Sequence, residues 1–294
     1  LKGVDSSPGY TGLGYGLLRC VPITFQRICW HWHNLIITKQ MVPLGLADLP
    51  IIALPKNNGL MSSYTNTRPI SLYEVLFKLA TGTVHEKVSD ILQKNRVLHP
   101  MQFFGQKGVG VIDALQLIIQ SLELCIRGGQ QVVVKSADVA AAFPSVRHWY
   151  LRMVMEGKGF PEEVIKFFML ADGHGTFRVR LSQAWSDSVK KPPGGVGQGE
   201  QGSPPKYILA IDILLWMLYK DKERGLFVGE GFAEHCKRHF PNMQPMIMDG
   251  WLVAILFCDD LCLVASNTLN MQHLIDITTR VHDFSGSRLV AYKS

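Results

Sequence analysis

Two adjacent carboxylates, Asp259 and Asp260, stand between the apolar runs 251–257 and 261–265, and this pattern constrains the fold more than any other feature. An ionised carboxylate that is buried without a partner costs several kcal/mol. The two runs are therefore predicted to form the strands of a hairpin, with the acids at its turn. That turn either faces solvent or holds a cation, and the neighbouring residues leave both alternatives open.

The composition is that of a folded protein with a mild basic excess. Of the 294 residues, 47% are hydrophobic, which is ample for a core. The 30 Lys and Arg against 24 Asp and Glu give a formal charge of +6, which suits a polyanionic partner but equally serves solubility. Every run of 18 residues that is rich in apolar side chains also carries a charge, so neither a transmembrane helix nor a membrane partner is expected.

Cysteine spacing and the first residues bear on location. The six cysteines show no CxxC spacing, which favours reduced thiols in an intracellular compartment, nucleus or cytoplasm. No charged segment followed by an apolar one opens the chain, so no secretory signal is expected. Because the sequence begins at Leu1 rather than Met, we expect a fragment of a longer protein.

Hydrophobic periodicity divides the chain into helices and short strands. Helices are expected over residues 22–38, 76–92, 112–126, 161–170, 204–222 and 268–284. Strands are expected over residues 51–54, 132–134 and 177–181, with 186–190 as a partner of the last, and over the hairpin 251–265. This mixture of hairpins and packed helices predicts the α+β class.

Capping residues and one apolar stripe give finer expectations. Ser145 is the expected N-cap of a helix that runs to Gly157, and Asn267 or Thr268 is the expected cap of the last helix. One face of the helix over 112–126 is apolar, and its residues are Ile112, Leu115, Ile119, Leu122 and Ile126. We expect this face to pack inward against the core.

A third acid, Asp138, follows the strand 132–134 and lies 121 residues before Asp259. A strand that ends at Asp138 and a turn at Asp259 could place carboxylates from distant segments at one edge of a sheet. Hard divalent cations bind such oxygen clusters, and two ions roughly 3.5–4 Å apart can activate a hydroxyl and stabilise a leaving pyrophosphate oxygen, as in polymerases. The alternative is that Asp138 caps a helix and the acidic pair is a solvent-exposed turn.

Further blocks accompany these acids in a fixed order. They read Ile-Ala-Leu-Pro-Lys at 52–56, Asn-Thr-Arg-Pro-Ile-Ser-Leu at 66–72, Asp-Val-Ala-Ala-Ala-Phe-Pro-Ser-Val at 138–146, Gly-Val-Gly-Gln-Gly at 195–199 with Ser-Pro at 203–204, Phe-Cys-Asp-Asp at 257–260, and a closing block at 286–293. Together they resemble the blocks of reverse transcriptases, and they are most similar to those of non-LTR retrotransposons and group II introns. The resemblance spans roughly residues 40–294.

The resemblance implies the fingers and palm of a right-hand polymerase, with an antiparallel palm sheet backed by helices. The fingers would cover residues 41–131 and the palm 132–294, with elements of the fingers interleaved at about 158–195. Residues 1–40 would be an N-terminal extension that is helical in part. A thumb would lie beyond Ser294, so the chain is expected to be truncated.

The resemblance also implies metal ligands and catalytic residues. Asp138 and Asp259 would bind two Mg²⁺ ions, which Mn²⁺ could replace, together with the backbone carbonyl of Val139. Asp260 would support the site electrostatically. Lys293, in the closing block, would protonate the departing pyrophosphate.

Nucleotide-binding residues follow from the same blocks. Lys56 and Arg68 would hold the triphosphate of the incoming nucleotide, Arg68 through its bidentate fork. Phe143 matches the bulky position that excludes a ribose 2′-hydroxyl. Gln198 and Gly199 would contact the nucleotide and the template base, in a loop where the backbone can approach a ligand closely.

The implied function is RNA-directed DNA polymerisation, with an RNA template, a DNA primer and dNTPs as partners. The sequence does not indicate an oligomeric state. Phe143 and the block 66–72 argue against an RNA-directed RNA polymerase. Pro144, Gly197 and Cys258 depart from the family pattern, which favours the alternative of a decayed, non-catalytic, nucleic-acid-binding remnant of a retroelement. Cys258 itself is expected to be a packed strand residue.

Overall fold

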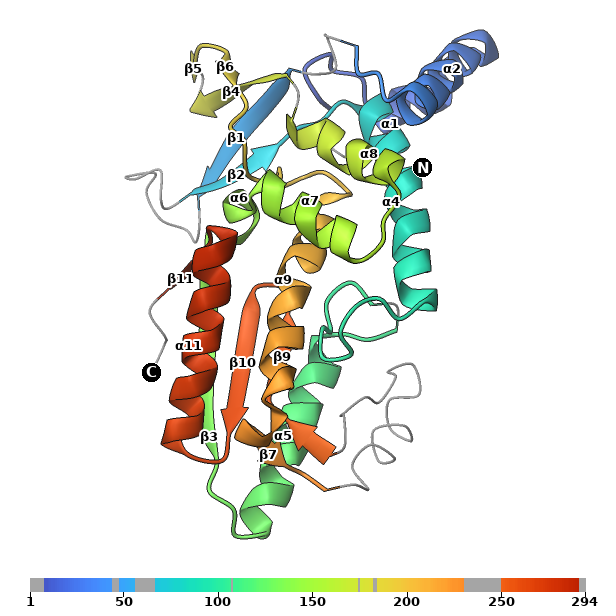
Figure 1. The fold of residues 1–294 in the computed structure, drawn as a ribbon. Coiled ribbons are helices and arrows are strands. Elements are labelled where there is room, and N and C mark those ends of the chain that lie inside the picture. Colours follow the sequence, from blue (N-terminus) through green and yellow to red (C-terminus); the bar gives the residue numbers. More distant parts are fainter. Residues whose placement is uncertain are drawn as a thin grey trace. The chain divides into compact units, whose positions relative to one another are not determined.

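The computed structural model describes residues 8–43, 48–55, 67–106, 108–173, 175–181, 184–229 and 250–290. Lys56 and Lys293 lie outside the described residues, so their roles stay predictions. The chain, drawn in Figure 1, divides into two compact units. Unit 1 consists of Leu1–Val88 and Met155–Ser203, and unit 2 of Ser89–Val154 and Pro204–Ser294. Which residues form fingers and which form palm also stays a prediction.

The predicted α+β class is confirmed, and each helix that periodicity indicated is found within three residues of its expected ends. The helices are α1 (Tyr15–Cys20), α2 (Ile23–Lys39), α4 (Val75–Lys94), α5 (Val111–Arg127), α6 (Ala142–Ser145), α7 (His148–Gly157), α8 (Glu162–Gly173), α9 (Ser203–Lys220), the 3₁₀ turn η2 (Lys222–Arg224) and α11 (Thr268–Ser285). The strands are β1 (Leu49–Pro55), β2 (Thr67–Ser71), β3 (Val133–Ala140), β4 (Thr176–Leu181), β5 (Ala184–Trp185), β6 (Val189–Lys190), β7 (Leu226–Phe227), β8 (Trp251–Leu252), β9 (Ala254–Phe257), β10 (Asp260–Ala265) and β11 (Arg288–Val290). Within the described ranges, no helix has both the length and the apolar character needed to cross a bilayer.

Unit 1 is built on a sheet whose strand order is β2-β1-β4-β5, with β6 also paired to β4. β1 runs antiparallel to β2 and parallel to β4. Unit 1 also has a small apolar cluster, in which Tyr15 and Leu18 of α1 pack with Val75 of α4. The amide of Gln40, just after α2, donates a hydrogen bond to the carbonyl of Glu163 in α8 at 2.7 Å, so the end of α2 is fixed to α8.

Unit 2 is built on an antiparallel sheet whose strand order is β11-β3-β10-β9. The central helix of this unit is α9, whose fully buried residues include Leu209, Leu214, Leu215 and Leu218. A helix that is apolar around most of its circumference is expected inside a domain. The hydroxyl of Tyr219 joins α9 to the strand region, because it donates to the carbonyl of Ala254 at 3.1 Å and accepts from the amide of Val253 at 3.4 Å.

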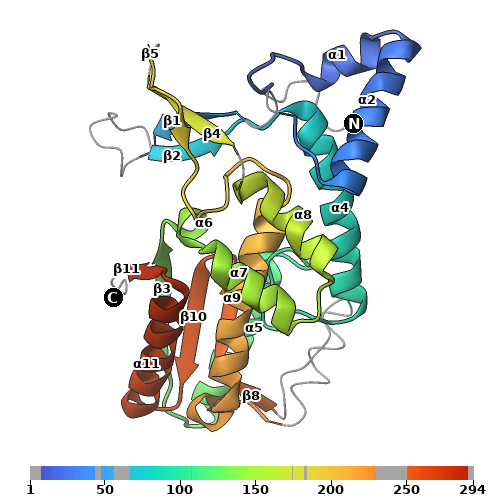
Figure 2. The ribbon, with the colours of Figure 1, turned by 45° about the horizontal axis from the view of Figure 1, so that its top comes forward.

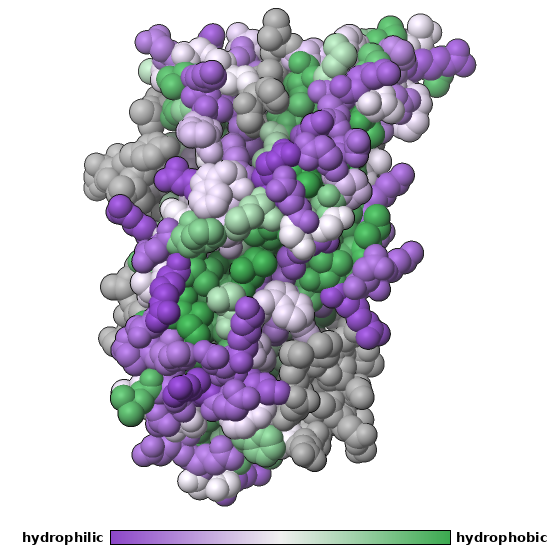
Figure 3. All heavy atoms as spheres, viewed as in Figure 1, coloured by the Kyte–Doolittle hydropathy of each residue, from purple (hydrophilic) through white to green (hydrophobic). Residues whose placement is uncertain are grey.

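The last helix, α11, lies against β3 and β10, as both Figure 1 and Figure 2 show. The predicted cap Asn267 is confirmed, since its side-chain oxygen accepts a hydrogen bond from the amide of Asn270 at 2.9 Å. The helix ends at Gly286, whose φ of +78° lies in the left-handed region that glycine adopts without strain. Figure 3 shows hydrophilic side chains over most of the outer surface of α11.

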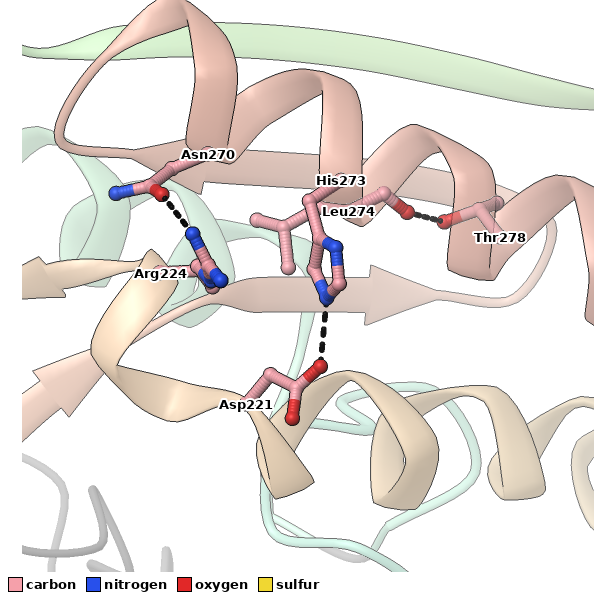
Figure 4. Close-up of polar contacts among 6 residues, drawn as sticks. All are labelled: Asp221, Arg224, Asn270, His273, Leu274 and Thr278. Atoms are coloured by element: carbon pink, nitrogen blue, oxygen red, sulfur yellow. Dashed lines mark hydrogen bonds and ion pairs between the residues drawn. The ribbon is translucent and has the colours of Figure 1, made fainter.

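Two polar contacts fasten α11 to the segment that follows α9 (Figure 4). His273 Nε2 lies 2.6 Å from Asp221 Oδ2, and Arg224 Nη1 donates to Asn270 Oδ1 at 2.9 Å. Both pairs are partly exposed, so each contributes no more than about 1 kcal/mol. Their main consequence is positional, because they hold α11 beside the sheet at the end remote from Gly286.

The inward packing expected for the apolar stripe of α5 is wrong. The buried residues of α5 are Ala114, Leu117, Ser121 and Cys125, most of them small. The exposed fractions of the expected inner residues are 62% for Ile112, 49% for Leu115, 53% for Ile119 and 63% for Ile126, and Leu122 is half-buried. A helix packs through the face that allows close approach, and the small side chains of α5 provide it toward β9.

The expected cap at Ser145 is also wrong. Ser145 is the last residue of α6, and its hydroxyl donates to the carbonyl of Ala142 at 2.8 Å. The backbone at Val146 is extended, so the next helix, α7, begins only at His148. The serine side chain therefore closes a short turn instead of opening a helix.

Candidate active site

The hairpin β9–β10 has a two-residue loop, because Phe257 pairs with Asp260 and only Cys258 and Asp259 lie between them. Cys258 is in this loop and not in a strand, which corrects the expectation for it. Its φ is +59°, a left-handed backbone that non-glycine residues rarely adopt. Such strain persists where the surrounding structure holds it, and it is most common at functional sites.

The strand β3 brings Asp138 to the same hairpin. In the antiparallel pair of β10 and β3, Leu261 stands opposite Ala137, and both are buried. Asp260 and Asp138 are the next residues along the two strands beyond this pair, and Asp260 is exposed whereas Asp138 is half-buried. Carboxylates at neighbouring positions are the kind of oxygen donors that a hard divalent cation binds.

The pKa of a buried tyrosine is affected by all three acids. Tyr207, on α9, is only 2% exposed. Burial, and after it the charges of Asp259, Asp138 and Asp260, raises the pKa of Tyr207 well above its ordinary value. One hydroxyl therefore lies within electrostatic reach of all three predicted acids, although they come from segments far apart in the sequence.

The ring of Tyr207 also supports Phe143. The two rings are stacked, with centroids 4.9 Å apart and an angle of 29° between their planes. Phe143 follows Ala141, whose φ of +49° turns the chain sharply at the end of β3. Sequence reasoning missed Tyr207; the available signal was its place in the first turns of the helix that follows the glycine-rich loop.

The hydroxyl of Tyr207 is enclosed, and among the described atoms it has no hydrogen-bond partner. The thiol of Cys258 behaves differently, since it hydrogen-bonds to Asp259. Burial, followed by the charge of Asp259, raises the pKa of Cys258 to about 12. The thiol is therefore protonated at neutral pH, which makes it a poor nucleophile.

The oxygen atoms at this strand edge suit a hard divalent cation whose coordination shell is completed by a substrate. In the described part of the chain, no three His, Cys, Asp or Glu side chains form a group that could hold a metal ion alone. Asp138 and Asp259 supply two carboxylates, and Val139 supplies a backbone carbonyl beside the first. Magnesium is commonly held by one or two carboxylates together with substrate phosphates, so this donor set suits it.

The predicted nucleotide-binding residues of unit 1 lie on β2 and on the glycine-rich loop. Arg68 is exposed on β2, and the loop pairs with this strand where Ser71 N donates to the carbonyl of Gln198 at 2.6 Å. Gly199 has a φ of +116°, and a Cβ there would lie 2.4 Å from the carbonyl oxygen of Ser71. Only glycine fits this position, because the backbone of β2 passes directly beside it.

Gly197, which stands where the family has an arginine, is also closely packed. A Cβ at this position would lie 2.4 Å from the hydroxyl of Tyr73 and 3.1 Å from the hydroxyl of Ser71. Its amide donates to Asp172 at 3.4 Å. A larger side chain at this position therefore requires the side chains of Tyr73 and Ser71 to shift.

The predicted site residues thus fall into two groups. Asp138, Val139, Asp259, Asp260 and Phe143 belong to unit 2, where the acids lie on β3 and on the hairpin β9–β10 that is paired with it. Arg68, Gln198 and Gly199 belong to unit 1, where they lie on adjoining segments. The catalytic and binding roles of both groups stay predictions.

Comparison with known proteins gives one significant relative in sequence. The chain is 24% identical over 291 residues to the Retrovirus-related Pol polyprotein from type-2 retrotransposable element R2DM of Drosophila melanogaster. The match covers 99% of this chain and 25% of that polyprotein, so the chain spans about a quarter of the length of this curated relative. No protein-family model matches the chain.

Solved telomerase structures share the fold. The apo telomerase of Candida tropicalis, truncated from its C-terminal domain, has a TM-score of 0.54 and 11% identity, over 90% of this chain and 56% of that one. Telomerase of the same organism in complex with a TWJ fragment of telomeric RNA has a TM-score of 0.52 and 13% identity, over 90% of this chain and 43% of that one. The chain therefore has a right-hand polymerase fold and resembles a reverse transcriptase domain of the non-LTR type.

Proposed function

We propose that this chain is the polymerase part of a retroelement reverse transcriptase, which extends a DNA primer on an RNA template with dNTPs. The observation that carries the proposal is the strand pairing, which brings the segment of β3 that contains Asp138 beside the β9–β10 hairpin that contains Asp259 and Asp260. The sequence similarity to a retrotransposon polyprotein along almost the whole chain supports it, and so does the likeness to telomerase.

In this proposal Asp138 and Asp259 hold two Mg²⁺ ions with the carbonyl of Val139, and Mn²⁺ can replace them. Divalent ions bound there would lower the pKa of the primer 3′-hydroxyl and would stabilise the charge on the leaving pyrophosphate oxygen. Asp260, exposed on the same edge, adds negative charge that favours cation binding. Lys293 is proposed to donate a proton to the departing pyrophosphate.

The nucleotide is proposed to be held by Lys56, Arg68, Phe143, Gln198 and Gly199, as the resemblance to reverse transcriptases implies. Arg68, exposed on β2, and Lys56 neutralise the triphosphate. Gln198 and Gly199 offer backbone groups that can approach the nucleotide and the template base. Phe143 sterically excludes a ribose 2′-hydroxyl, and stacking on Tyr207 holds the ring of Phe143 in place. The formal charge of +6 favours a nucleic-acid partner, and an intracellular location, in nucleus or cytoplasm, follows from that partner.

Primer extension tests the proposal. With a poly(rA) template, an oligo(dT) primer and Mg²⁺, Asp259→Ala should lower dTTP incorporation at least about 100-fold, because losing about 3 kcal/mol of transition-state stabilisation has that effect. The matched control is Asp276→Ala, which removes an exposed carboxylate from α11 and should leave incorporation unchanged. Equal incorporation by Asp259→Ala and the unaltered chain would refute a catalytic role for this edge.

A second candidate is a non-catalytic nucleic-acid-binding remnant of a retroelement, for which the departures from the resembled blocks at Pro144 and Gly197 are the argument. The two candidates differ in one assay. If the unaltered chain retains the poly(rA)/oligo(dT) duplex in a salt-sensitive manner but incorporates no dTTP with either Mg²⁺ or Mn²⁺, the remnant is the correct reading.

A further inference from the structure

Helix α5 carries an exposed apolar stripe, here named the α5 seam. Its residues are Ile112, Leu115, Ile119, Leu122 and Ile126. Four of the five are about half exposed or more, which is unusual for large aliphatic side chains that follow one another along a single face. Among the described residues, α5 contacts β9, and the buried residues of α5 lie on its other, small-residue face; of the seam, only Leu122 is half-buried.

The spacing of the α5 seam is that of a helix that packs against another helix. Its residues alternate by three and four positions, so they occupy the a and d positions of a heptad repeat. Isoleucine stands at each a position and leucine at each d position. In parallel helix pairs, β-branched residues at a with leucine at d favour two strands over three or four.

We propose that the α5 seam is a self-association surface, on which the α5 helix of a second copy of this chain packs in parallel about a two-fold axis. Such an interface is self-complementary, because every a residue meets its own counterpart and so does every d residue. The seam itself carries no charge, and Glu123 and Arg127 beside it lie 3.7 Å apart and pair with each other.

The area of the α5 seam is sufficient for a weak, specific dimer. The exposed parts of its side chains amount to about 500 Å² in one copy and about 1,000 Å² in two, which is the lower limit for a specific interface. A nucleic acid fits the seam poorly, because phosphates are bound by Lys and Arg and the seam has neither. A row of aliphatic side chains at this spacing along one helix suits another helix better than a small molecule.

Sedimentation equilibrium of the 294-residue chain tests the proposal. Between about 1 and 100 µM, the range in which small interfaces dissociate, the apparent mass should rise from the monomer toward twice that value. Ile119→Glu, at the centre of the seam, should hold the mass at the monomer throughout, with an unchanged circular dichroism spectrum. The control Leu269→Glu, at an 83% exposed leucine of α11 outside the seam, should associate like the unaltered chain.

A cross-linking variant tests the parallel arrangement separately. In-register copies bring position 119 against itself, so Ile119→Cys should form a covalent dimer under mild oxidation, and Leu269→Cys should not exceed the unaltered chain. A monomer mass at 100 µM, or equal association of Ile119→Glu and the unaltered chain, would overturn the proposal. Capture of the seam by a different segment of a longer polypeptide, with no dimer, would overturn it as well.

Discussion

Replacing Tyr207 by phenylalanine should stabilise the protein, although the tyrosine is buried and at the centre of the candidate site. The ring stays stacked on Phe143, so only the hydroxyl is removed. That hydroxyl is enclosed, finds no partner among the described atoms and lies in the field of Asp259 and Asp138. Burying an unsatisfied hydroxyl costs about 1–3 kcal/mol, so we expect the free energy of unfolding to rise by about 1 kcal/mol in Tyr207→Phe.

Urea denaturation at neutral pH, followed by circular dichroism, measures the change, provided that the slope of the unfolding free energy against urea is the same in both proteins. Tyr219→Phe is the matched control, because it removes a hydroxyl from the same helix at a similarly buried position. The hydroxyl of Tyr219 makes two hydrogen bonds, so its removal should lower the free energy of unfolding by about 1–2 kcal/mol.

The two variants should therefore move in opposite directions. If Tyr207→Phe lowers the stability as much as Tyr219→Phe does, the hydroxyl of Tyr207 has a partner. A cavity of about 20 Å³ lined by Tyr207 and Tyr150 is large enough for one water molecule, which is the partner that this result would indicate. The hydroxyl of Tyr207 would then not be an unsatisfied buried group.

Three further changes test other parts of the structure. Gly199→Ala should lower the free energy of unfolding by about 2–4 kcal/mol, because its Cβ would clash with the backbone of Ser71. The control Gly129→Ala also has a positive φ, of +71°, but open space around it, so it should cost only about 1 kcal/mol. Equal urea midpoints of the two variants would contradict the close approach of Gly199 to Ser71. Burial lowers the pKa of His282 to about 4 from an ordinary 6.5, so the unfolded chain binds the proton first and stability should fall by about 3 kcal/mol as the pH drops from 6.5 to 4. His282→Gln should flatten that part of the stability profile, and an unchanged acid slope would show that other groups cause it. Asn267→Ala should cost about 1 kcal/mol in thermal or urea unfolding through loss of the cap of α11, and an unchanged midpoint would mean that the cap is dispensable.

The sequence predicted the elements of this fold better than their orientation. Long periodic segments such as 204–222 and the apolar runs around Asp259 have a strong local signal, and the structure confirms their type. The sequence had no such signal for which face of α5 packs inward, since periodicity identifies an apolar face without indicating what covers it. The small residues Ala114 and Ser121 decide the matter through how closely the helix can approach β9, which only the packed structure shows.

The candidate site was predictable where residues carry recognisable chemistry. Asp138, Asp259 and Asp260 are acids beside apolar strands, and the structure places them at adjoining strand ends. The sequence signal for Tyr207 was weak, because an aromatic residue near the start of an apolar helix is normally core. Its importance arises from what surrounds it, and those neighbours lie more than 50 residues away along the chain.

The strand order of unit 2 has a consequence for how the protein is made. Both neighbours of β3 come from the end of the sequence, since β10 and β11 follow it by more than 100 residues. At a synthesis rate of about 5–20 residues per second, β3 leaves the ribosome roughly 6–25 seconds before β10 exists to pair with it. During that interval both of its edges are open to mispairing. The acids of the candidate site are therefore brought together only after the segment that contains β10 has been synthesised.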